Sequence, residues 1–238
     1  MYLDFAALSP ADRYKLIVNT ITPRPIAWTV TRGADGTVNA APHSFFNALA
    51  DDPPLLVLGL LAHHARGDDK DTARLIRETG EFTVALVSET DAAAMNLTAA
   101  DAPPGVDELA AAGVATRPAT KIAPPLIASA PVNFECKVWQ ILDPGPRSTV
   151  VLGEIVAMHV RDEFVEDAAK LRFEQRRAAL PDQRRECRPI PSIRKIEAQA
   201  RLPRLAGRCE YVRIADQREI AQSGKWICFD QFVPGARC

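Results

Sequence analysis

The chain has 238 residues, of which 47% are apolar and 25% are charged, and its net charge is -1. This composition is that of an ordinary soluble globular protein, so it excludes the disordered, collagen-like and disulfide-stapled classes. The length is sufficient to bury a large core as one domain.

The N-terminal residues predict a short helix and then a hairpin. Ser9 as cap, Pro10 at the first helical position and Asp12 in the first turn predict a helix that runs to about residue 18. The prolines that follow force an extended backbone, and residues 26–31 alternate as a half-buried strand. A glycine turn at 33–36 leads into a second strand.

The next segment alternates between strands and helices. After an expected loop at 41–44, residues 54–61 are continuously apolar, which predicts a strand buried on both faces. Residues 70–80 are expected to form a helix that Gly80 ends, and residues 82–87 a strand. The Ala-rich residues 89–113 predict two helical pieces separated by a Pro-Pro-Gly sequence.

The C-terminal half begins with an expected hairpin of strands 133–142 and 149–160 around a turn at 144–146. Residues 166–179 show a helical pattern, and short strands are expected at 211–214 and 226–229. Many strands with inserted helices predict an α+β fold built on a closed or partly closed barrel.

Several features indicate the compartment. The early acid Asp4 without a basic lead does not suggest a secretory signal, and the longest apolar stretch, 53–62, is about half of what a membrane-spanning helix needs. Five cysteines without a C-x-x-C spacing favour a reducing compartment and argue against structural zinc. His63 and His64 have no further ligands at a useful spacing, so solvated loop histidines are expected. We expect a cytoplasmic protein that binds neither metal nor membrane.

Charge is distributed unevenly along the chain. Residues 1–169 carry 13 basic and 22 acidic side chains, whereas residues 170–218 carry 14 basic and 6 acidic ones. The arginines alternate with aliphatic side chains rather than with stacking aromatic ones, and they could equally pair with the acidic part of the chain. Nucleic acid is therefore not the expected partner.

The usual nucleotide and hydrolase signatures are absent, since the sequence contains no G-x-G-x-x-G after a strand, P-loop, H-E-x-x-H or G-x-S-x-G. Three polar clusters remain. Lys70, Asp71 and Thr72 stand at an expected helix N-terminus, which favours an anion such as phosphate, although a simple helix cap beside a solvated lysine is an alternative.

The second cluster, residues 39–47, reads as a loop between two strands that is rich in hydrogen-bond donors. Its Ser and Asn could bind phosphate and ribityl hydroxyls, or the segment could be a turn with its phenylalanines in the core. In the third, residues 22–29, an extended rigid backbone could present N–H and C=O groups to a planar heterocycle.

These clusters, in this order and spacing, resemble the flavin reductase-like, FMN-binding split-barrel family, in the branch that includes flavoredoxin. The resemblance covers about residues 10–214. Its motifs are Thr-Pro-Arg-Pro-Ile-Ala-Trp-Thr at 22–29, Asn-x-Ala-Pro-His-Ser-Phe-Phe-Asn at 39–47, Asp-Pro-Pro at 52–54, Lys-Asp-Thr at 70–72 and Gly-Glu-Phe at 80–82. The chain departs from the family at Ala206, in a longer connection over 166–203, and in an unmatched segment from 218.

The resemblance implies a six-stranded antiparallel Greek-key split β-barrel with inserted helices, one FMN per subunit and a homodimer. We expect one domain over residues 1–218 and a C-terminal tail over 219–238. The implied cofactor-binding residues are Arg24, Pro25, Ile26, Trp28, Thr29, Asn39, Ser44, Phe45, Phe46, Asn47, Lys70, Asp71 and Thr72. His159 is the implied catalytic residue near the nicotinamide or flavin, the alternative being a strand-end histidine without a chemical role.

The resemblance thus implies an FMN-dependent oxidoreductase, an NAD(P)H:flavin reductase that passes hydride from the nicotinamide to flavin N5. Its partners would be NADH or NADPH and a flavin or another small acceptor. One alternative is a flavoredoxin-like electron carrier reduced by a redox protein partner at the basic region 170–218. Another is a non-catalytic flavin-binding module.

Overall fold

The computed structural model describes residues 1–61, 70–100, 102–103, 105–170 and 172–173. These residues divide into two compact units, one within Met1–Arg24 and one that begins at Pro25. Several expected features lie outside the described residues: His63 and His64, the basic region, the short strands 211–214 and 226–229, and the tail 219–238. The single domain over 1–218 stays a prediction.

The N-terminal unit contains a 3₁₀ turn, η1 (Phe5–Ala7), and helix α1 (Pro10–Thr20). The Ser9 hydroxyl accepts a hydrogen bond from the Asp12 N–H at 3.1 Å, so the predicted cap and helix are confirmed, and the helix ends two residues later than expected. After it, the Arg24 guanidinium donates to the Val18 and Ile21 carbonyls at 2.6 and 2.8 Å.

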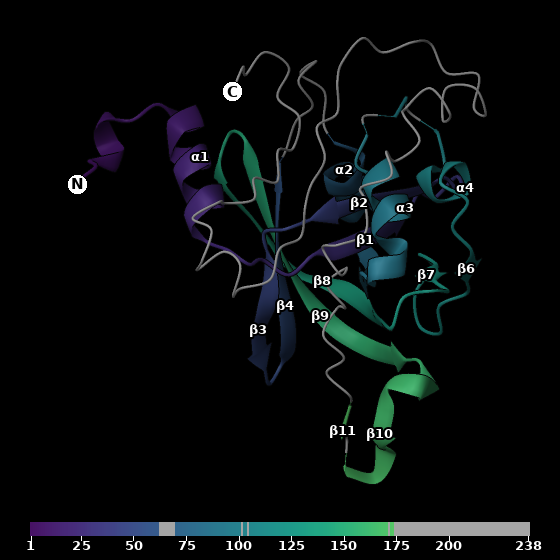
Figure 1. Cartoon of the computed structure of the whole chain (residues 1–238). Coiled ribbons are helices and arrows are strands. Elements are labelled where there is room, and N and C mark those ends of the chain that lie inside the picture. The colour runs from purple at the N-terminus through teal and green to yellow at the C-terminus, as the bar shows by residue number, and fades with distance from the viewer. Residues whose placement is uncertain (62–69, 101, 104, 171, 174–238) are drawn as a thin grey trace, which may run out of the picture. The chain divides into compact units, whose positions relative to one another are not determined.

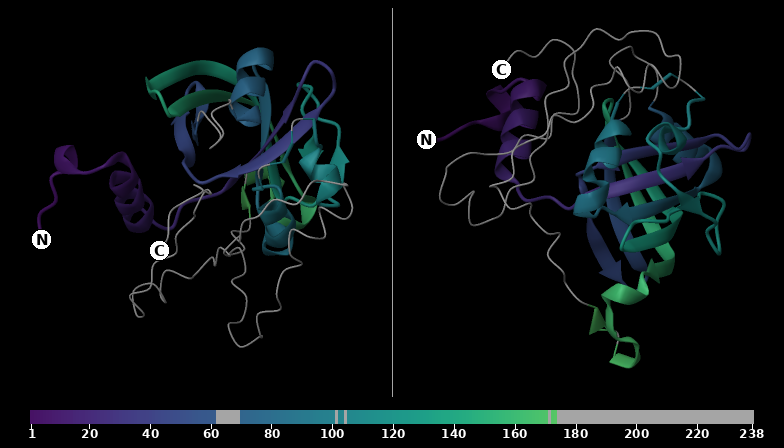
Figure 2. Two further views of the ribbon diagram at one scale, coloured as in Figure 1. Left: turned by 90° about the horizontal axis from the view of Figure 1, so that it is seen from above. Right: turned by 45° about the vertical axis from the view of Figure 1, so that its right-hand side comes forward.

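The second unit is built on a seven-stranded antiparallel sheet (Figure 1). In spatial order the strands are β2-β1-β5-β8-β9-β4-β3. β2 also approaches β4, so the sheet curls on itself (Figure 2). The strand bounds are β1 Ala27–Arg32, β2 Val38–His43, β3 Phe46–Asp51, β4 Pro54–Leu61, β5 Glu81–Leu86, β8 Val132–Gly145 and β9 Ser148–Val160.

The connections supply short helices and two small strands. Helix α2 ends at Gly80, whose φ of +69° is the left-handed conformation that glycine adopts most readily. The predicted α2 helix and the two helical pieces within 89–113 are confirmed. The elements are α2 Asp71–Thr79, η2 Glu89–Asp91, α3 Ala92–Leu97, α4 Glu108–Ala111, β6 Thr116–Arg117 and β7 Leu126–Ile127.

Two apolar clusters cover opposite faces of β1 and β5. One contains Phe82 and Leu56 and includes Ile76 of α2. The other contains Trp28 with Met95 of α3 and Leu109 of α4. All of β1 except Arg32 is therefore buried, on both faces of the strand, so the expectation of a half-buried strand over residues 26–31 is wrong.

The structure corrects four further sequence-based expectations. Residues 39–47 are not one loop, because β2 continues to His43 and β3 begins at Phe46; Pro42 is tolerated since β2 pairs only with β1. The sheet thus has seven strands where six were expected. In β4 the residues on one face are buried and those on the other are half-buried.

The fourth correction concerns the segment after β9, which begins with η3 (Asp162–Phe164) and β10 (Val165–Asp167). The described part of 166–179 is not one helix, because it consists of the end of β10, the 3₁₀ turn η4 (Ala168–Lys170) and β11 (Arg172–Phe173). β10 pairs antiparallel with β11, and this pairing overrides a weak local helical preference. Among the described residues, no helix has the length and apolar character needed to cross a membrane.

Candidate functional site

Polar side chains from β1, β2 and the start of α2 meet at one end of the curled sheet. The Asn39 amide donates to the Thr72 hydroxyl at 2.9 Å and lies 3.3 Å from the Thr31 hydroxyl. All three residues are buried. The structure thus brings together residues from two of the polar clusters that the sequence singled out.

The N-terminus of α2 has the character of an anion site. Its N-cap residue is Lys70, which supplies no side-chain acceptor for the first N–H groups of the helix. The Asp71 carboxylate does not cap the helix and pairs instead with Arg74 at 2.8 Å. Free N–H groups, the positive end of the helix dipole, an ammonium group and the Thr72 hydroxyl all favour a bound anion.

His43 lies at the other end of β2 from Asn39, opposite Ala27 of β1. Its Nδ1 is 3.1 Å from the Thr29 hydroxyl, and the ring is buried. Burial, together with the nearby positive charge of Lys70, lowers the pKa of His43 to about 4. The ring is therefore neutral near pH 7.

The predicted cofactor-binding residues before and within β1 lie in different environments. Pro25 is exposed and Ile26 is half-buried just before the first ladder pair, Ala27 with His43. The Trp28 ring is fully buried in the second apolar cluster, and its Nε1–H donates to the Thr98 hydroxyl at 3.0 Å. At Trp28 the main chain of β1 lies between β2 and β5, opposite Pro42 and Ala85, so the structure does not bring Trp28 to the polar cluster. Arg24 belongs to the N-terminal unit.

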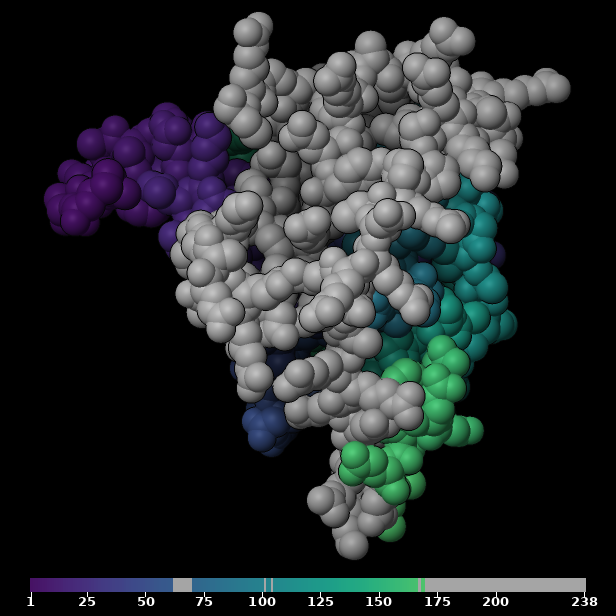
Figure 3. All heavy atoms as spheres, in the orientation of Figure 1, coloured from purple at the N-terminus to yellow at the C-terminus, as the bar shows by residue number. Residues whose placement is uncertain are grey.

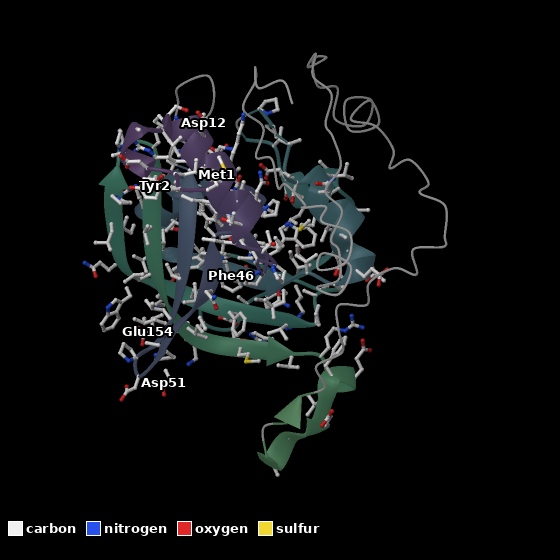
Figure 4. The ribbon with its side chains drawn as sticks, turned by 60° about the vertical axis from the view of Figure 1, so that its left-hand side comes forward. Met1, Tyr2, Asp12, Phe46, Asp51 and Glu154 are labelled. Atoms are coloured by element: carbon white, nitrogen blue, oxygen red, sulfur yellow. The ribbon has the colours of Figure 1, made fainter. Side chains whose placement is uncertain are left out.

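The predicted residues 44–47 connect β2 to β3. Ser44 is half-buried, Phe45 is 38% exposed, and Phe46 packs against the first apolar cluster (Figure 4). The Phe45 carbonyl accepts from the Gly59 N–H at 2.6 Å. Asn47 is exposed and its side chain accepts from the Ala48 N–H, so it closes a local turn.

His159 forms a separate arrangement on β9. Its Nε2 lies 2.5 Å from Oε1 of the fully buried Glu135, which also accepts from the backbone N–H groups of Thr120 and Lys121 at 2.8 and 2.7 Å. Nδ1 of His159 is 3.4 Å from Arg117. Burial alone would raise the pKa of Glu135, but these donors hold it below its usual value.

His159 is not among the clustered residues of β1, β2 and α2. Three successive strand pairings separate it from β1: His159 lies opposite Asn133 of β8, Asn133 opposite Ala85 of β5, and Ala85 opposite Trp28 of β1. Three strand spacings amount to roughly 14 Å along the sheet. Its catalytic role stays a prediction.

Two acidic residues were missed by the sequence analysis. One is Glu135, and the other is Glu108 at the start of α4, whose Oε2 accepts from the Ala40 N–H at 3.1 Å. Burial raises the pKa of Glu108 to about 7, and the negative charges of Asp71 and Asp107 add to the shift. The signal in both cases was an acid in an otherwise apolar or alternating segment.

Neither thiol nor metal chemistry is indicated within the described part of the chain. Cys136 is buried, and burial raises the pKa of its thiol above the usual value, which leaves it unreactive. No group of three or more His, Cys, Asp or Glu side chains there could hold a metal ion.

Comparison with known proteins places these features in context. The sequence model of the flavin reductase like domain matches residues 19–181. An uncharacterised protein of Deinococcus radiodurans is 41% identical over 173 residues, which is 71% of this chain and 75% of that protein.

Two solved structures are similar in both sequence and fold. The 2-nitrobenzoate 2-nitroreductase NbaA of Pseudomonas fluorescens is 36% identical with a TM-score of 0.66, over 73% of this chain and 82% of that chain. Nitrilotriacetate monooxygenase component B from Bacillus cereus is 30% identical with a TM-score of 0.67, over 70% of this chain and 84% of that chain.

Proposed function

The chain belongs to the flavin reductase-like family, and on that premise we propose that it is an FMN-dependent oxidoreductase that takes hydride from NADH or NADPH. The observation that carries the proposal is the group formed by Lys70, Thr72 and Asn39 at the uncapped start of α2. Its donors fit a phosphate group, and a phosphate ester is the part that distinguishes FMN from riboflavin. The curled sheet is the split barrel of this family.

The chain's own residues would bind and orient the cofactor. The Lys70 ammonium and the Thr72 hydroxyl would hold the phosphate, and the Asn39 amide, which donates to that hydroxyl at 2.9 Å, would orient it. Ser44 and Asn47 would lie nearest to the ribityl chain. The main chain of Pro25 and Ile26 precedes the β1–β2 ladder and would lie along the flavin ring. Bound FMN would supply the hydride acceptor, and the protein would supply binding and orientation.

A homodimer is part of the proposal. Large apolar side chains are exposed on the half of the sheet formed by β8, β9, β4 and β3. Figure 4 labels Phe46, Asp51 and Glu154 in this half, and Figure 3 shows the β3–β4 hairpin at the surface. A second copy that covered this face would remove them from water. They are Phe45, Leu49, Trp139 and Leu142, with 38, 51, 54 and 44% exposure.

Trp139→Glu is expected to convert the dimer to a monomer, because a charge at the centre of an apolar interface must be desolvated without a partner. Light scattering coupled to size-exclusion chromatography measures the mass directly. Lys121→Glu, on an exposed side chain elsewhere, is the control. A wild-type monomer, or a Trp139→Glu dimer, would contradict the proposed interface.

The function is tested by anaerobic titration of the FMN-loaded protein with NADH and then NADPH, following the oxidised flavin band. Bleaching by either nucleotide supports the reductase and identifies its donor. If only dithionite bleaches the band, the flavoredoxin-like carrier is the better assignment, and a protein that binds no flavin contradicts both.

The cysteine usage of the sequence supports a cytoplasmic location for this chemistry.

The electron acceptor has two candidates. One is free flavin, the acceptor that the family resemblance implies, and the other is a nitroarene, which the 36% identity to the 2-nitrobenzoate 2-nitroreductase suggests. Turnover of the reduced protein with free FMN and with 2-nitrobenzoate separates them.

Lys70→Ala is expected to raise the Kd for FMN by about ten- to a hundredfold, because it removes a charge-assisted contact to the phosphate. The Kd for riboflavin, which lacks the phosphate, is expected to stay the same. Quenching of flavin fluorescence measures both constants, and Lys121→Ala is the control for loss of one positive charge. Equal FMN binding by Lys70→Ala and wild type would remove the proposed phosphate site.

A further inference from the structure

Glu108 connects α4 to the edge of the sheet beside the proposed phosphate site. Strand β2 pairs with β1 along one edge, with Ala40 opposite Val30. The Ala40 N–H points away from β1 and donates to Glu108 Oε2 at 3.1 Å. The neighbouring Leu109 is buried in the same apolar cluster as Ala40. The carboxylate is therefore the hydrogen-bond partner of an edge strand, held in place by a buried leucine.

The residue before Ala40 is Asn39, whose amide contacts Thr72 and Thr31. The direction of the Asn39 side chain depends on the main chain of β2 at this point. A carboxylate that fixes Ala40 therefore also fixes the amide that orients the Thr72 hydroxyl of the proposed phosphate site.

We propose that Glu108 is a positioning residue of the phosphate site, acting through the Ala40 N–H on Asn39, and that its ionised form opposes binding of the phosphate. The inference rests on the proposed function, since it concerns the same site. It adds a group that controls how flavin affinity varies with pH.

The charged groups around Glu108 determine the sign of this effect. Asp107 lies on its own element and Asp71 on α2, and both disfavour its ionised form. On α2, Arg74 is paired with Asp71 and Glu78, and Lys70 lies near His43 at the end of β2. His43 is neutral above a pKa of about 4, so it does not titrate near neutrality.

The pKa of Glu108 is raised by burial to about 7, so the carboxyl changes charge in the neutral range. A bound phosphate would raise that pKa further, because it adds negative charge nearby. Binding would then take up a proton, and affinity for FMN would fall as the pH rises through 7. The phosphate of FMN itself titrates near pH 6, and this changes the affinity of every variant alike. The effect of Glu108 is therefore the difference in FMN affinity between wild type and a Glu108 variant at the same pH.

The test is the Kd for FMN and for riboflavin between pH 6 and 8.5 at constant ionic strength, measured by fluorescence quenching. Glu108→Gln keeps an acceptor for the Ala40 N–H and removes the charge. We expect it to bind FMN up to about tenfold more tightly than wild type at pH 8 and equally at pH 6. Glu108→Ala loses the acceptor and is expected to bind FMN more weakly at every pH.

Glu163→Gln is the matched control, because Glu163 is exposed and pairs with Arg161 at 3.0 Å. It should follow the wild-type pH profile. The inference is overturned if Glu108→Gln also follows that profile, or if riboflavin shows the same difference between the two proteins. Should Glu108→Ala fail to fold, Glu108→Gln decides alone.

The failure of the proposed function itself would look different. In that case Lys70→Ala would bind FMN as wild type does, whatever the Glu108 variants show. If Lys70→Ala weakens FMN binding and Glu108→Gln still matches the wild-type profile, only the role of Glu108 is lost.

Discussion

Phe82→Ala is expected to lower the free energy of unfolding by about 3–5 kcal/mol, the usual cost of truncating a fully buried aromatic ring. Phe82 has no exposed surface and lies on β5 in the apolar cluster that also holds Leu56 and Val151. Ile76 of α2 packs into the same cluster, so the ring also supports the helix that begins at Asp71. Urea denaturation with an unchanged m-value measures the loss.

The partner of the Phe82 ring is Gly153 on β9. A Cβ built on Gly153 would lie 2.4 Å from Cζ of Phe82, which real atoms do not tolerate. Gly153→Ala is therefore expected to cost about 1–3 kcal/mol in wild type and less in a Phe82→Leu background, which lacks Cζ. Additive costs in this double-mutant cycle would show that the ring does not fill the space above the glycine.

Local signals made much of the fold predictable. Pro10 and Ser9 determine where α1 begins, Gly80 determines where α2 ends, and the alternation of residues 133–142 predicts β8. The strand β3 was missed for a physical reason. Its sequence, Phe-Asn-Ala-Leu-Ala-Asp, contains no β-branched residue, and it forms because β4 offers an unpaired edge.

The candidate site was predictable to the extent that its residues lie in short motifs. Lys70, Thr72 and Asn39 follow from such motifs, and the structure adds that they meet. Glu108 and Glu135 could not be found this way, because their partners are backbone N–H groups 68 and 14–15 positions away. The burial of Trp28 depends on α3 and α4 covering that face of β1, which no local pattern reveals.

Glu135→Ala is expected to lower the free energy of unfolding by about 3–5 kcal/mol at pH 7, because three donors lose a fully buried acceptor at once. The variant leaves the N–H groups of Thr120 and Lys121 and the His159 ring without their acceptor. The pKa of Glu135 is lower in the folded chain, so its stabilisation is present above its ordinary pKa of 4.5. The difference from wild type should therefore shrink as the pH falls below that value.

The same pair separates the two interpretations of His159. His159→Gln keeps a donor toward Glu135, so it is expected to change stability by less than about 1 kcal/mol. If the histidine also transfers a proton during reduction of the flavin, His159→Gln slows bleaching by NADH or NADPH about a hundredfold or more while the Kd for FMN stays constant. An unchanged rate together with a destabilised Glu135→Ala would assign the ring to support of the buried carboxylate, in agreement with its distance of three strands from β1.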